Sequence, residues 1–367
     1  MTELRVVEED FINLNPLQTG GRTTPDVRKA VNSFIDGYSV CDWCLGDVNT
    51  IKNPDIQGLR DDIGKFLGAD EVILTNGCRE AKYAVMQAVC KKGGKVLADV
   101  NRHYSTDVAA ELAGLKMEFV QNSGSPEFKI RAEDYAKRID EVSPDLVLLT
   151  HVDGNYGNVA DAAKVGAICR KKGVPFILNA AYSAGRMLVD NKKIRADFIA
   201  CSGHKSWAVG GGNIGLLGVN NDFKDKVLKR SSEYKNKILG ILGCSARGSS
   251  AVALLNSFPS VKKRVKDWGK EVKNAQWFAN KMLSINGVEL IGENPHQHDL
   301  MQFSTPVFYE ISQKHKKKGY FLYKFLEEKG VRGLKAGRTK NFKVSTYGLG
   351  MEKLKYVFEV FREAAKL

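Results

Sequence analysis

The stretch Cys201-Ser202-Gly203-His204-Lys205-Ser206 follows directly after the apolar run Phe198-Ile199-Ala200. A lysine at the end of a buried strand, among small and hydrogen-bonding residues, is placed to form an imine with an aldehyde cofactor. Desolvation and a nearby cation would lower the pKa of that lysine and leave its amine nucleophilic. The same few letters also occur around ordinary surface lysines, so the assignment depends on the rest of the chain.

A turn that suits a phosphate lies earlier in the sequence. Thr75-Asn76-Gly77-Cys78-Arg79-Glu80 reads as the end of a strand, a turn and the start of a helix. Backbone N–H groups at a helix N-terminus bind phosphate, and Gly77 lets the ligand approach the backbone closely. A plain strand-to-helix turn would have the same pattern.

Two further polar residues follow predicted strands. Asn179 ends the buried run Phe176-Ile177-Leu178 and precedes Lys205 by 26 positions, where it can face the nitrogen of a pyridine ring. His103 follows another strand and offers an aromatic ring to stack on a cofactor. With the phosphate turn, these residues favour pyridoxal phosphate (PLP) held by Lys205 as a Schiff base.

The surrounding sequence alternates short apolar runs with helical stretches. Such alternation predicts a mostly parallel sheet with helices on both faces. The predicted strands are 72–74, 95–98, 117–120, 146–149, 175–178, 198–200 and 215–218, and the helices are 79–91, 106–113, 132–141 and 160–172.

The pattern changes after about residue 250. A helical region at 261–283 is followed by predicted strands at 288–291, 302–303, 307–308 and 343–345, and by helices at 320–329 and 351–367. We therefore expect an N-terminal segment over 1–45 that contributes to the active site, a large PLP-binding domain over 46–255 and a small α+β domain over 256–367. No internal repeat is visible.

The order and spacing of these motifs resemble the PLP-dependent transferases of the aspartate-aminotransferase-like fold (fold type I). Asn179 departs from the aspartate usual in that superfamily. A neutral amide stabilises a protonated pyridine nitrogen less than a carboxylate does, so the electron sink is weaker. This favours elimination of a good leaving group over transamination. Asn155, in Asp-Gly-Asn-Tyr-Gly at 153–157, is a candidate contact to the cofactor O3′, although turn chemistry explains it equally well.

The N-terminal region narrows the resemblance. Phe11 to Arg22 reads Phe-Ile-Asn-Leu-Asn-Pro-Leu-Gln-Thr-Gly-Gly-Arg, and Tyr38 to Cys44 reads Tyr-Ser-Val-Cys-Asp-Trp-Cys. With Gly-Cys-Arg-Glu-Ala-Lys at 77–82, Ser-Gly-His-Lys at 202–205 and Gly-Cys-Ser-Ala-Arg at 243–247, the chain closely resembles the archaeal O-phosphoseryl-tRNA:cysteinyl-tRNA synthase family nearly end to end.

This resemblance implies a PLP-dependent homodimer that converts O-phosphoseryl-tRNA(Cys) and a sulfur donor to cysteinyl-tRNA(Cys) and phosphate, with a phosphoseryl-tRNA synthetase as partner. The cofactor contacts of the family then fall on Cys78, Arg79, Asn179, Ser202, Gly203 and His204, with Lys205 as the Schiff-base residue. Cys78 is a departure, since the family more often has a small apolar residue there.

Three cysteines are candidates for sulfur transfer. Cys41, Cys44 and Cys244 lack the apolar surroundings of Cys90, Cys169 and Cys201, which we expect to be small core residues. They can carry sulfur as a persulfide that a partner thiol releases through a disulfide. Ligation of an iron–sulfur cluster through three thiolates and an inert structural role remain open. A structural zinc site lacks a fourth ligand.

Two steps of the predicted reaction involve other side chains. Lys205 is the natural base for the substrate α-proton once it is released from the cofactor. Arg79 and His204 are candidates for the cofactor phosphate and the phosphoseryl group, and Arg247 for the leaving phosphate. For Arg247 a structural loop arginine is an equal alternative.

Composition agrees with a polyanionic partner. The chain of 367 residues carries 56 basic against 42 acidic residues, a net charge of +14 that suits tRNA through counterion release. Basic runs include 262–264, 316–318 and the tract 335–343. The polar start and the lack of a long apolar stretch predict a cytoplasmic protein that binds no membrane. With tRNA as the nucleic-acid partner, we expect no DNA binding.

Two alternatives follow from the same residues. A cysteine desulfurase shares the fold and also uses a cysteine persulfide, but it typically has one catalytic cysteine on a mobile loop and no need of a basic surface. A non-enzymatic RNA-binding scaffold would not need the cofactor residues at all.

Overall fold

The computed structural model describes residues 11–40, 51–243 and 247–367. Its largest element is a seven-stranded sheet in the order β2-β8-β7-β6-β5-β3-β4. The strands are β2 (Glu71–Thr75), β3 (Lys95–Asp99), β4 (Lys116–Val120), β5 (Leu146–Thr150), β6 (Phe176–Asn179), β7 (Phe198–Ser202) and β8 (Gly215–Val219). Only β8 runs antiparallel to its neighbours β2 and β7, so the sheet is mostly parallel, as the sequence predicted.

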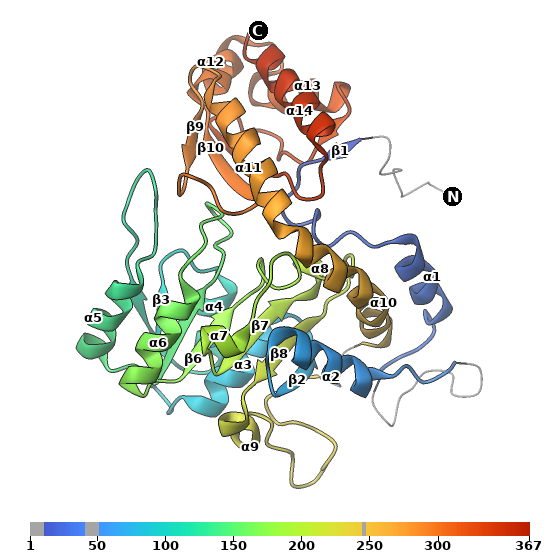
Figure 1. Cartoon of the computed structure of the whole chain (residues 1–367), viewed down its shortest axis with the longest axis vertical. Helices are drawn as coiled ribbons and strands as arrows, with labels where there is room; N and C mark the ends of the chain where they lie inside the picture. The colour runs from blue at the N-terminus through green and yellow to red at the C-terminus, as the bar shows by residue number, and fades with distance from the viewer. Residues whose placement is uncertain (1–10, 41–50, 244–246) are drawn as a thin grey trace.

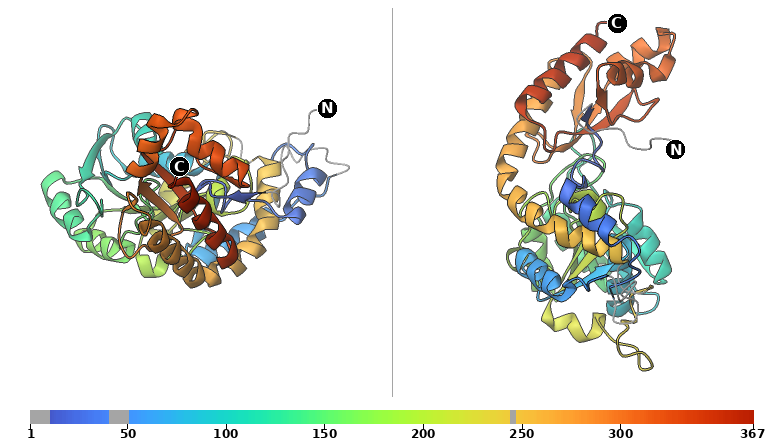
Figure 2. Two further views of the ribbon diagram at one scale, coloured as in Figure 1. Left: turned by 90° about the horizontal axis from the view of Figure 1, so that it is seen from above. Right: turned by 90° about the vertical axis from the view of Figure 1, so that its right-hand side faces the viewer.

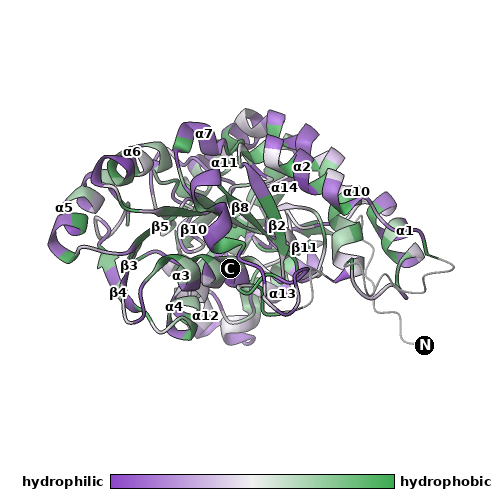
Figure 3. Cartoon of the chain, turned by 90° about the horizontal axis from the view of Figure 1, so that it is seen from below, coloured by the Kyte–Doolittle hydropathy of each residue, from purple (hydrophilic) through white to green (hydrophobic). Residues whose placement is uncertain are grey.

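Helices cover both faces of this sheet (Figure 1). They include α2 (Ile56–Leu67), α3 (Cys78–Val89), α4 (Ser105–Leu112), α5 (Ala132–Val142), α6 (Ala162–Lys172), α7 (Asn191–Ile194), α8 (Gly203–Ser206) and α9 (Lys224–Val227). The strands β5 to β8 are almost entirely buried, which explains why they read as continuous apolar runs. Figure 3 shows this pattern, with hydrophobic strands inside and hydrophilic residues on the outer helices α5 and α7.

A second unit follows the sheet domain. It contains the three-stranded antiparallel sheet β12-β10-β9, formed by β9 (Glu289–Ile291), β10 (Leu300–Ser304) and β12 (Asn341–Ser345). The helices α11 (Trp268–Leu283), α12 (Pro306–Lys314), α13 (Phe321–Glu328) and α14 (Met351–Ala364) pack on it. It has a hydrophobic core of its own, built from Leu14 and from residues 275–364.

The N-terminal segment joins the two units. Its short strand β1 (Ile12–Asn13) pairs in parallel with β11 (Val331–Arg332) of the smaller unit. The helix α1 (Pro25–Ser33) then packs on α10 (Gly248–Arg264) beside the large sheet. Figure 2 shows the segment passing between the two units, with α10 and α11 linking them on the other side.

Two predicted elements differ from the structure. The helical region at 261–283 is two helices, because α10 begins at Gly248 and a 3-10 turn at Val265–Asp267 separates it from α11. The strand predicted at 307–308 is wrong, since both residues lie in α12. Pro306 occupies the first turn of that helix, and the buried Phe308 is one of its core contacts. A two-residue apolar run does not distinguish a strand from a buried helical turn.

Candidate active site

The candidate site lies where several strands of the large sheet end. The strands β2, β3, β5, β6 and β7 run in the same direction, so their carboxyl ends meet at one edge of the sheet. Ligands of open α/β sheets bind at this edge. The residues that follow these strands include Cys78, His103, Asn155, Asn179 and Lys205.

Lys205 lies in the short helix α8 directly after β7, with a side chain only 7% exposed. Its Nζ lies 4.4 Å from the centroid of the Tyr182 ring. Among the described residues, this Nζ has no hydrogen-bond acceptor. Burial, together with the charges of Lys82 and Arg186, lowers the pKa of Lys205 to about 8. The amine is therefore available as a nucleophile near neutral pH.

Asn179 ends β6 and is buried. Its Oδ1 accepts hydrogen bonds from the backbone N–H of Ala181 at 3.3 Å and from the Cys78 thiol at 3.5 Å. Because a backbone N–H donates to an oxygen, these contacts identify Oδ1 as the acceptor of the Asn179 amide. The Nδ2 group is left to donate to a ligand.

The predicted phosphate turn begins α3 at Cys78. Gly77 caps the helix with a φ of 107°, which favours glycine. A Cβ at Gly215 would come within 2.7 Å of the Cys78 nitrogen, so β8 approaches this turn closely. The free N–H groups of the first helical turn face the site edge and suit a phosphate. The side chain of Arg79 is exposed.

The residues just before Lys205 form a second polar group. The Ser202 Oγ lies 3.3 Å from His204 Nδ1. Burial, followed by the charge of Lys205, lowers the pKa of His204. Gly203 donates its N–H to the carbonyl of Ile214, and a Cβ there would meet the Ile214 side chain at 2.4 Å. Only glycine fits this position.

His103 is half-buried beside Tyr104, with ring centroids 4.3 Å apart. Its Nδ1 lies 2.9 Å from the Ser105 hydroxyl. Burial, then the charge of Lys205, lowers the pKa of His103 to about 4. The imidazole is consequently uncharged at neutral pH, which suits stacking on a cofactor ring.

Two predicted site residues make no described side-chain contact with this group. Asn155 is exposed, and its backbone N–H donates to Asp153 Oδ1 in a turn, which agrees with turn chemistry. Arg247 is exposed at the start of α10, where it forms an isolated antiparallel bridge with Ser39.

Cys41, Cys44 and Cys244 lie outside the described residues. Within residues 11–40, 51–243 and 247–367, no cluster of three His, Cys, Asp or Glu side chains has the placement of a metal site. Cys169 and Cys201 are buried core residues and Cys90 is half-buried. No helix of the described chain combines the length and the apolarity that a membrane crossing needs.

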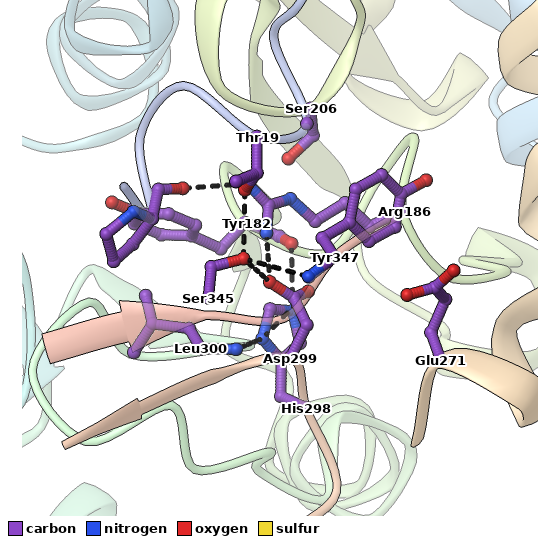
Figure 4. Close-up of polar contacts among 12 residues, drawn as sticks. Thr19, Tyr182, Arg186, Ser206, Glu271, His298, Asp299, Leu300, Ser345 and Tyr347 are labelled. Atoms are coloured by element: carbon purple, nitrogen blue, oxygen red, sulfur yellow. Dashed lines mark hydrogen bonds and ion pairs between the residues drawn. The ribbon is translucent and has the colours of Figure 1, made fainter. Parts of the chain in front are cut away.

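Sequence reasoning missed a buried ion pair beneath Lys205. Arg186 and Asp299 are both fully buried, and Arg186 Nη1 donates to Asp299 Oδ2 (Figure 4). The same arginine donates through Nη2 to the backbone carbonyls of Lys205, at 3.2 Å, and of Pro16, at 2.8 Å. Ser345 donates its hydroxyl to Asp299. One guanidinium thus joins the Lys205 turn, the N-terminal segment and the smaller unit.

The N-terminal segment packs directly on the Lys205 turn. A Cβ at Gly21 would clash with the carbonyl of His204, and one at Gly20 with the carbonyl of Lys205. Arg264 donates to the carbonyls of Gly20 and Ser206. The glycine pair was visible in the sequence, but nothing there indicated its partner.

A buried lysine was also missed. Lys82 is fully buried in α3 and donates to the hydroxyls of Ser105 and Thr106, both at 2.8 Å. Its position one helical turn after Cys78 places a cation under the site. The side chains around Lys205 are therefore mainly cationic or neutral, which suits an anionic ligand.

These residues fit PLP. Lys205 is a buried amine without a hydrogen-bond acceptor among the described residues, and Asn179 has a free donor. The start of α3 suits the phosphate, and His103 offers a neutral ring. The amine, the donor for the ring nitrogen, the stacking ring and the phosphate-binding backbone turn thus lie at the same sheet edge.

Comparisons with known proteins identify relatives over nearly the whole chain. The family model of O-phosphoseryl-tRNA(Sec) selenium transferase, SepSecS, matches residues 80–366. A protein named O-phospho-L-seryl-tRNA:Cys-tRNA synthase from Methanothermobacter thermautotrophicus is 44% identical over 363 residues, covering 98% of this chain and 96% of the relative. Its counterpart from Methanosarcina acetivorans is 47% identical over 362 residues, covering 97% and 93%.

Solved structures agree as well. A crystal structure of a SepCysS–SepCysE N-terminal domain complex superposes with a TM-score of 0.91 at 43% identity, covering 99% of this chain and 96% of the other. A cysteine desulfurase from Thermococcus onnurineus NA1 superposes at 0.77 with 20% identity and complete coverage of both chains, and shows the fold alone. The chain belongs to the SepSecS family of PLP-dependent fold-type-I enzymes, together with its relatives named O-phospho-L-seryl-tRNA:Cys-tRNA synthase.

Proposed function

We propose that this protein converts O-phosphoseryl-tRNA(Cys) and a sulfur donor to cysteinyl-tRNA(Cys) and phosphate. The observation that carries the proposal is the pairing of a buried, weakly basic Lys205 with a cationic site that includes Lys82, together with relatives of that name covering nearly the whole chain. The enzyme is a PLP-dependent transferase.

The chemistry is a β-replacement. Bound PLP withdraws electrons from the substrate Cα and makes its proton removable. Lys205 takes that proton, and the bond between Cβ and the phosphate oxygen breaks with its electron pair leaving on the phosphate. A sulfide sulfur then forms the Cβ–S bond, and Lys205 returns its proton to Cα. When a cysteine persulfide is the donor, its terminal sulfur forms that bond and a second protein thiolate attacks the inner sulfur, so the S–S bond breaks with its electron pair on the cysteine product and a protein disulfide forms. A sulfide donor therefore gives cysteine and phosphate in equal amounts.

Each candidate residue has a proposed role. The backbone at Cys78 and Arg79 and the Ser202–His204 pair hold the cofactor phosphate, and His103 stacks on the ring. Asn179 donates to the ring nitrogen. Arg79 and His204 also serve the phosphoseryl group. For Asn155 we propose a contact to the cofactor O3′, and for Arg247 a contact to the leaving phosphate.

A sulfur relay through Cys41, Cys44 and Cys244 is part of the proposal. The bridge between Ser39 and Arg247, with the bond from the Gly248 N–H to the Tyr38 carbonyl, joins the chain leading to Cys41 to the chain leaving Cys244. An iron–sulfur cluster on these thiolates remains the alternative.

The assembly is proposed to be a cytoplasmic homodimer that works with a phosphoseryl-tRNA synthetase. Tyr38 and Leu242 are 73% and 63% exposed, and Val40 and Ile241 line a cavity of about 1060 Å³ beside them. Exposed apolar groups of this kind suit a protein interface. We also propose the domain division 1–45, 46–255 and 256–367. Two separate hydrophobic cores support a large and a small unit, although Phe258, Val261 and Val265 pack in the larger core.

The experiment that tests the function compares two substrates. The purified protein with PLP should form cysteinyl-tRNA from O-phosphoseryl-tRNA and sulfide, and should release no alanine from free L-cysteine. Alanine release without tRNA conversion would establish a cysteine desulfurase instead.

A further inference from the structure

Two basic segments that lie apart in the sequence meet on the smaller unit. A Cβ at Gly319 would lie 3.5 Å from the Gly337 Cα, so the segment at 314–319 touches the one at 335–343. Together they form a basic ridge, made of Lys314, Lys316, Lys317, Lys318, Lys335, Arg338, Lys340 and Lys343, all of them exposed.

The ridge is held in a fixed shape. The Thr305 N–H donates to the carbonyl of Lys340 at 2.8 Å, and the Thr305 hydroxyl donates to the carbonyl of Thr339 at 2.7 Å. The Thr339 hydroxyl in turn donates to Ser312 Oγ in α12 at 3.3 Å. The second segment is thereby anchored to the helix that leads into the first.

The positive charge of the ridge is barely neutralised. Within the described part of the chain, only Lys317 forms an ion pair with a carboxylate, Glu328, at 2.7 Å. Lys340 lies over the ring of Tyr309. The other cations have no carboxylate within ion-pair distance among these residues, so an external anion can approach them without displacing an internal partner.

One end of the ridge reaches the candidate active site. Lys343 donates to the carbonyl of Gly154 at 2.7 Å, across the boundary between the two units. Its charge lowers the pKa of both Lys205 and His103. The charges of Lys335 and Arg338 likewise lower the pKa of Lys343. These three cations therefore lead outward from Lys205.

We propose that the basic ridge binds the phosphodiester backbone of the acceptor end of the tRNA. This inference rests on the proposed function. The reacting amino acid is esterified to the 3′ end, so the last phosphates of the tRNA have to leave the site close to Lys205. A group of cations that begins there can neutralise the last phosphates of the tRNA and reads no base.

The test uses PLP-loaded full-length protein and fluorescently labelled tRNA(Cys). The outer-ridge variant Lys316→Ala/Lys318→Ala/Lys335→Ala/Arg338→Ala leaves Lys343 and the active site intact. The control, Lys91→Ala/Lys92→Ala, removes two exposed lysines just after α3, beyond the end of that helix opposite Cys78. Dissociation constants are measured against salt concentration, and PLP absorbance checks that each protein is folded.

The outer-ridge variant should bind the tRNA about tenfold or more weakly, and the slope of log K against log salt should become shallower by roughly 3. The KM for O-phosphoseryl-tRNA should rise while kcat at saturating tRNA stays unchanged. The control should match the wild-type protein.

Equal tRNA affinity and salt slope in the outer-ridge and wild-type proteins would overturn the inference, even if the ridge then proved to bind an acidic protein. An equal loss of tRNA affinity in the control would overturn it too, because the effect would then come from net charge rather than from the ridge. If wild-type protein failed to convert the tRNA at all, the proposed function would fail. The binding measurement would still test whether the ridge binds tRNA.

Discussion

The Cys78 thiol lies 3.5 Å from Asn179 Oδ1, and burial raises the pKa of this thiol, so it keeps the proton that it donates. With the Ala181 N–H on the same oxygen, the amide presents its Nδ2 group to the ligand. When Nδ2 donates a hydrogen bond to the pyridine nitrogen of PLP, that nitrogen accepts it and carries no proton.

We therefore expect the pyridine nitrogen of bound PLP to be unprotonated in the wild-type protein and protonated in Asn179→Asp. The measurement is the ¹⁵N chemical shift of labelled PLP in each protein. Cys78→Ala retains the Ala181 bond and should leave the wild-type shift in place. A protonated nitrogen in the wild-type protein would refute this account of the amide.

The lowered pKa of Lys205 predicts a pH dependence for cofactor binding. Because the free amine attacks the aldehyde, the rate at which apo-protein takes up PLP should rise with pH and level off above about 8. Stopped-flow absorbance across the pH range measures this rate. Lys205→Ala should show no such phase, and a wild-type midpoint near the ordinary lysine pKa would contradict the burial effect.

The Arg186–Asp299 pair makes a prediction for stability. Removing one partner leaves the other charge buried without compensation, so Arg186→Met or Asp299→Leu should each lower the free energy of unfolding by about 3–5 kcal/mol. The double variant should recover most of this loss. Urea unfolding measures all three, and additive losses in the double variant would show that the two residues act independently.

Replacing Arg186 should also act on Lys205. In the double variant the arginine charge no longer lowers the pKa of Lys205, so the midpoint for PLP uptake should move to higher pH. A fold loosened around Lys205 would also raise this pKa by relieving its burial, so the shift counts as a charge effect only if the double variant unfolds with the wild-type free energy. An unchanged midpoint would limit Arg186 to a structural role.

The cysteine relay is tested by changing Cys41, Cys44 and Cys244 singly to alanine. When a donor that generates protein persulfide replaces free sulfide, each variant should keep the PLP absorbance and lose most of the conversion of O-phosphoseryl-tRNA. Full activity in all three would exclude the relay, and iron bound to wild-type protein purified without oxygen but absent from the variants would favour the cluster.

Much of this fold was predictable because buried parallel strands read as continuous apolar runs that end in polar residues, as at Asn179 and Ser202. Cys78 and Asn179 could be placed at the same edge for that reason. The pairing of Arg186 with Asp299 could not, since 113 residues separate them and neither has a distinctive neighbourhood. The contact of Gly20 and Gly21 with the Lys205 turn depends on how the N-terminal segment returns over the sheet, which local sequence does not encode.

The basic runs show the same limit. Both were visible as runs of charge, and each alone is typical of a solvated face. Their meeting at Gly319 and Gly337 is a tertiary contact, and only that contact turns two runs into one surface.

The most direct test of the central claim is a single turnover of O-phosphoseryl-tRNA(Cys) with excess PLP-loaded protein and sulfide. Cysteinyl-tRNA and inorganic phosphate should appear in equal amounts and at the same rate, and Lys205→Ala should form neither. Phosphate release without cysteinyl-tRNA, or turnover that persists in Lys205→Ala, would contradict a β-replacement performed by Lys205.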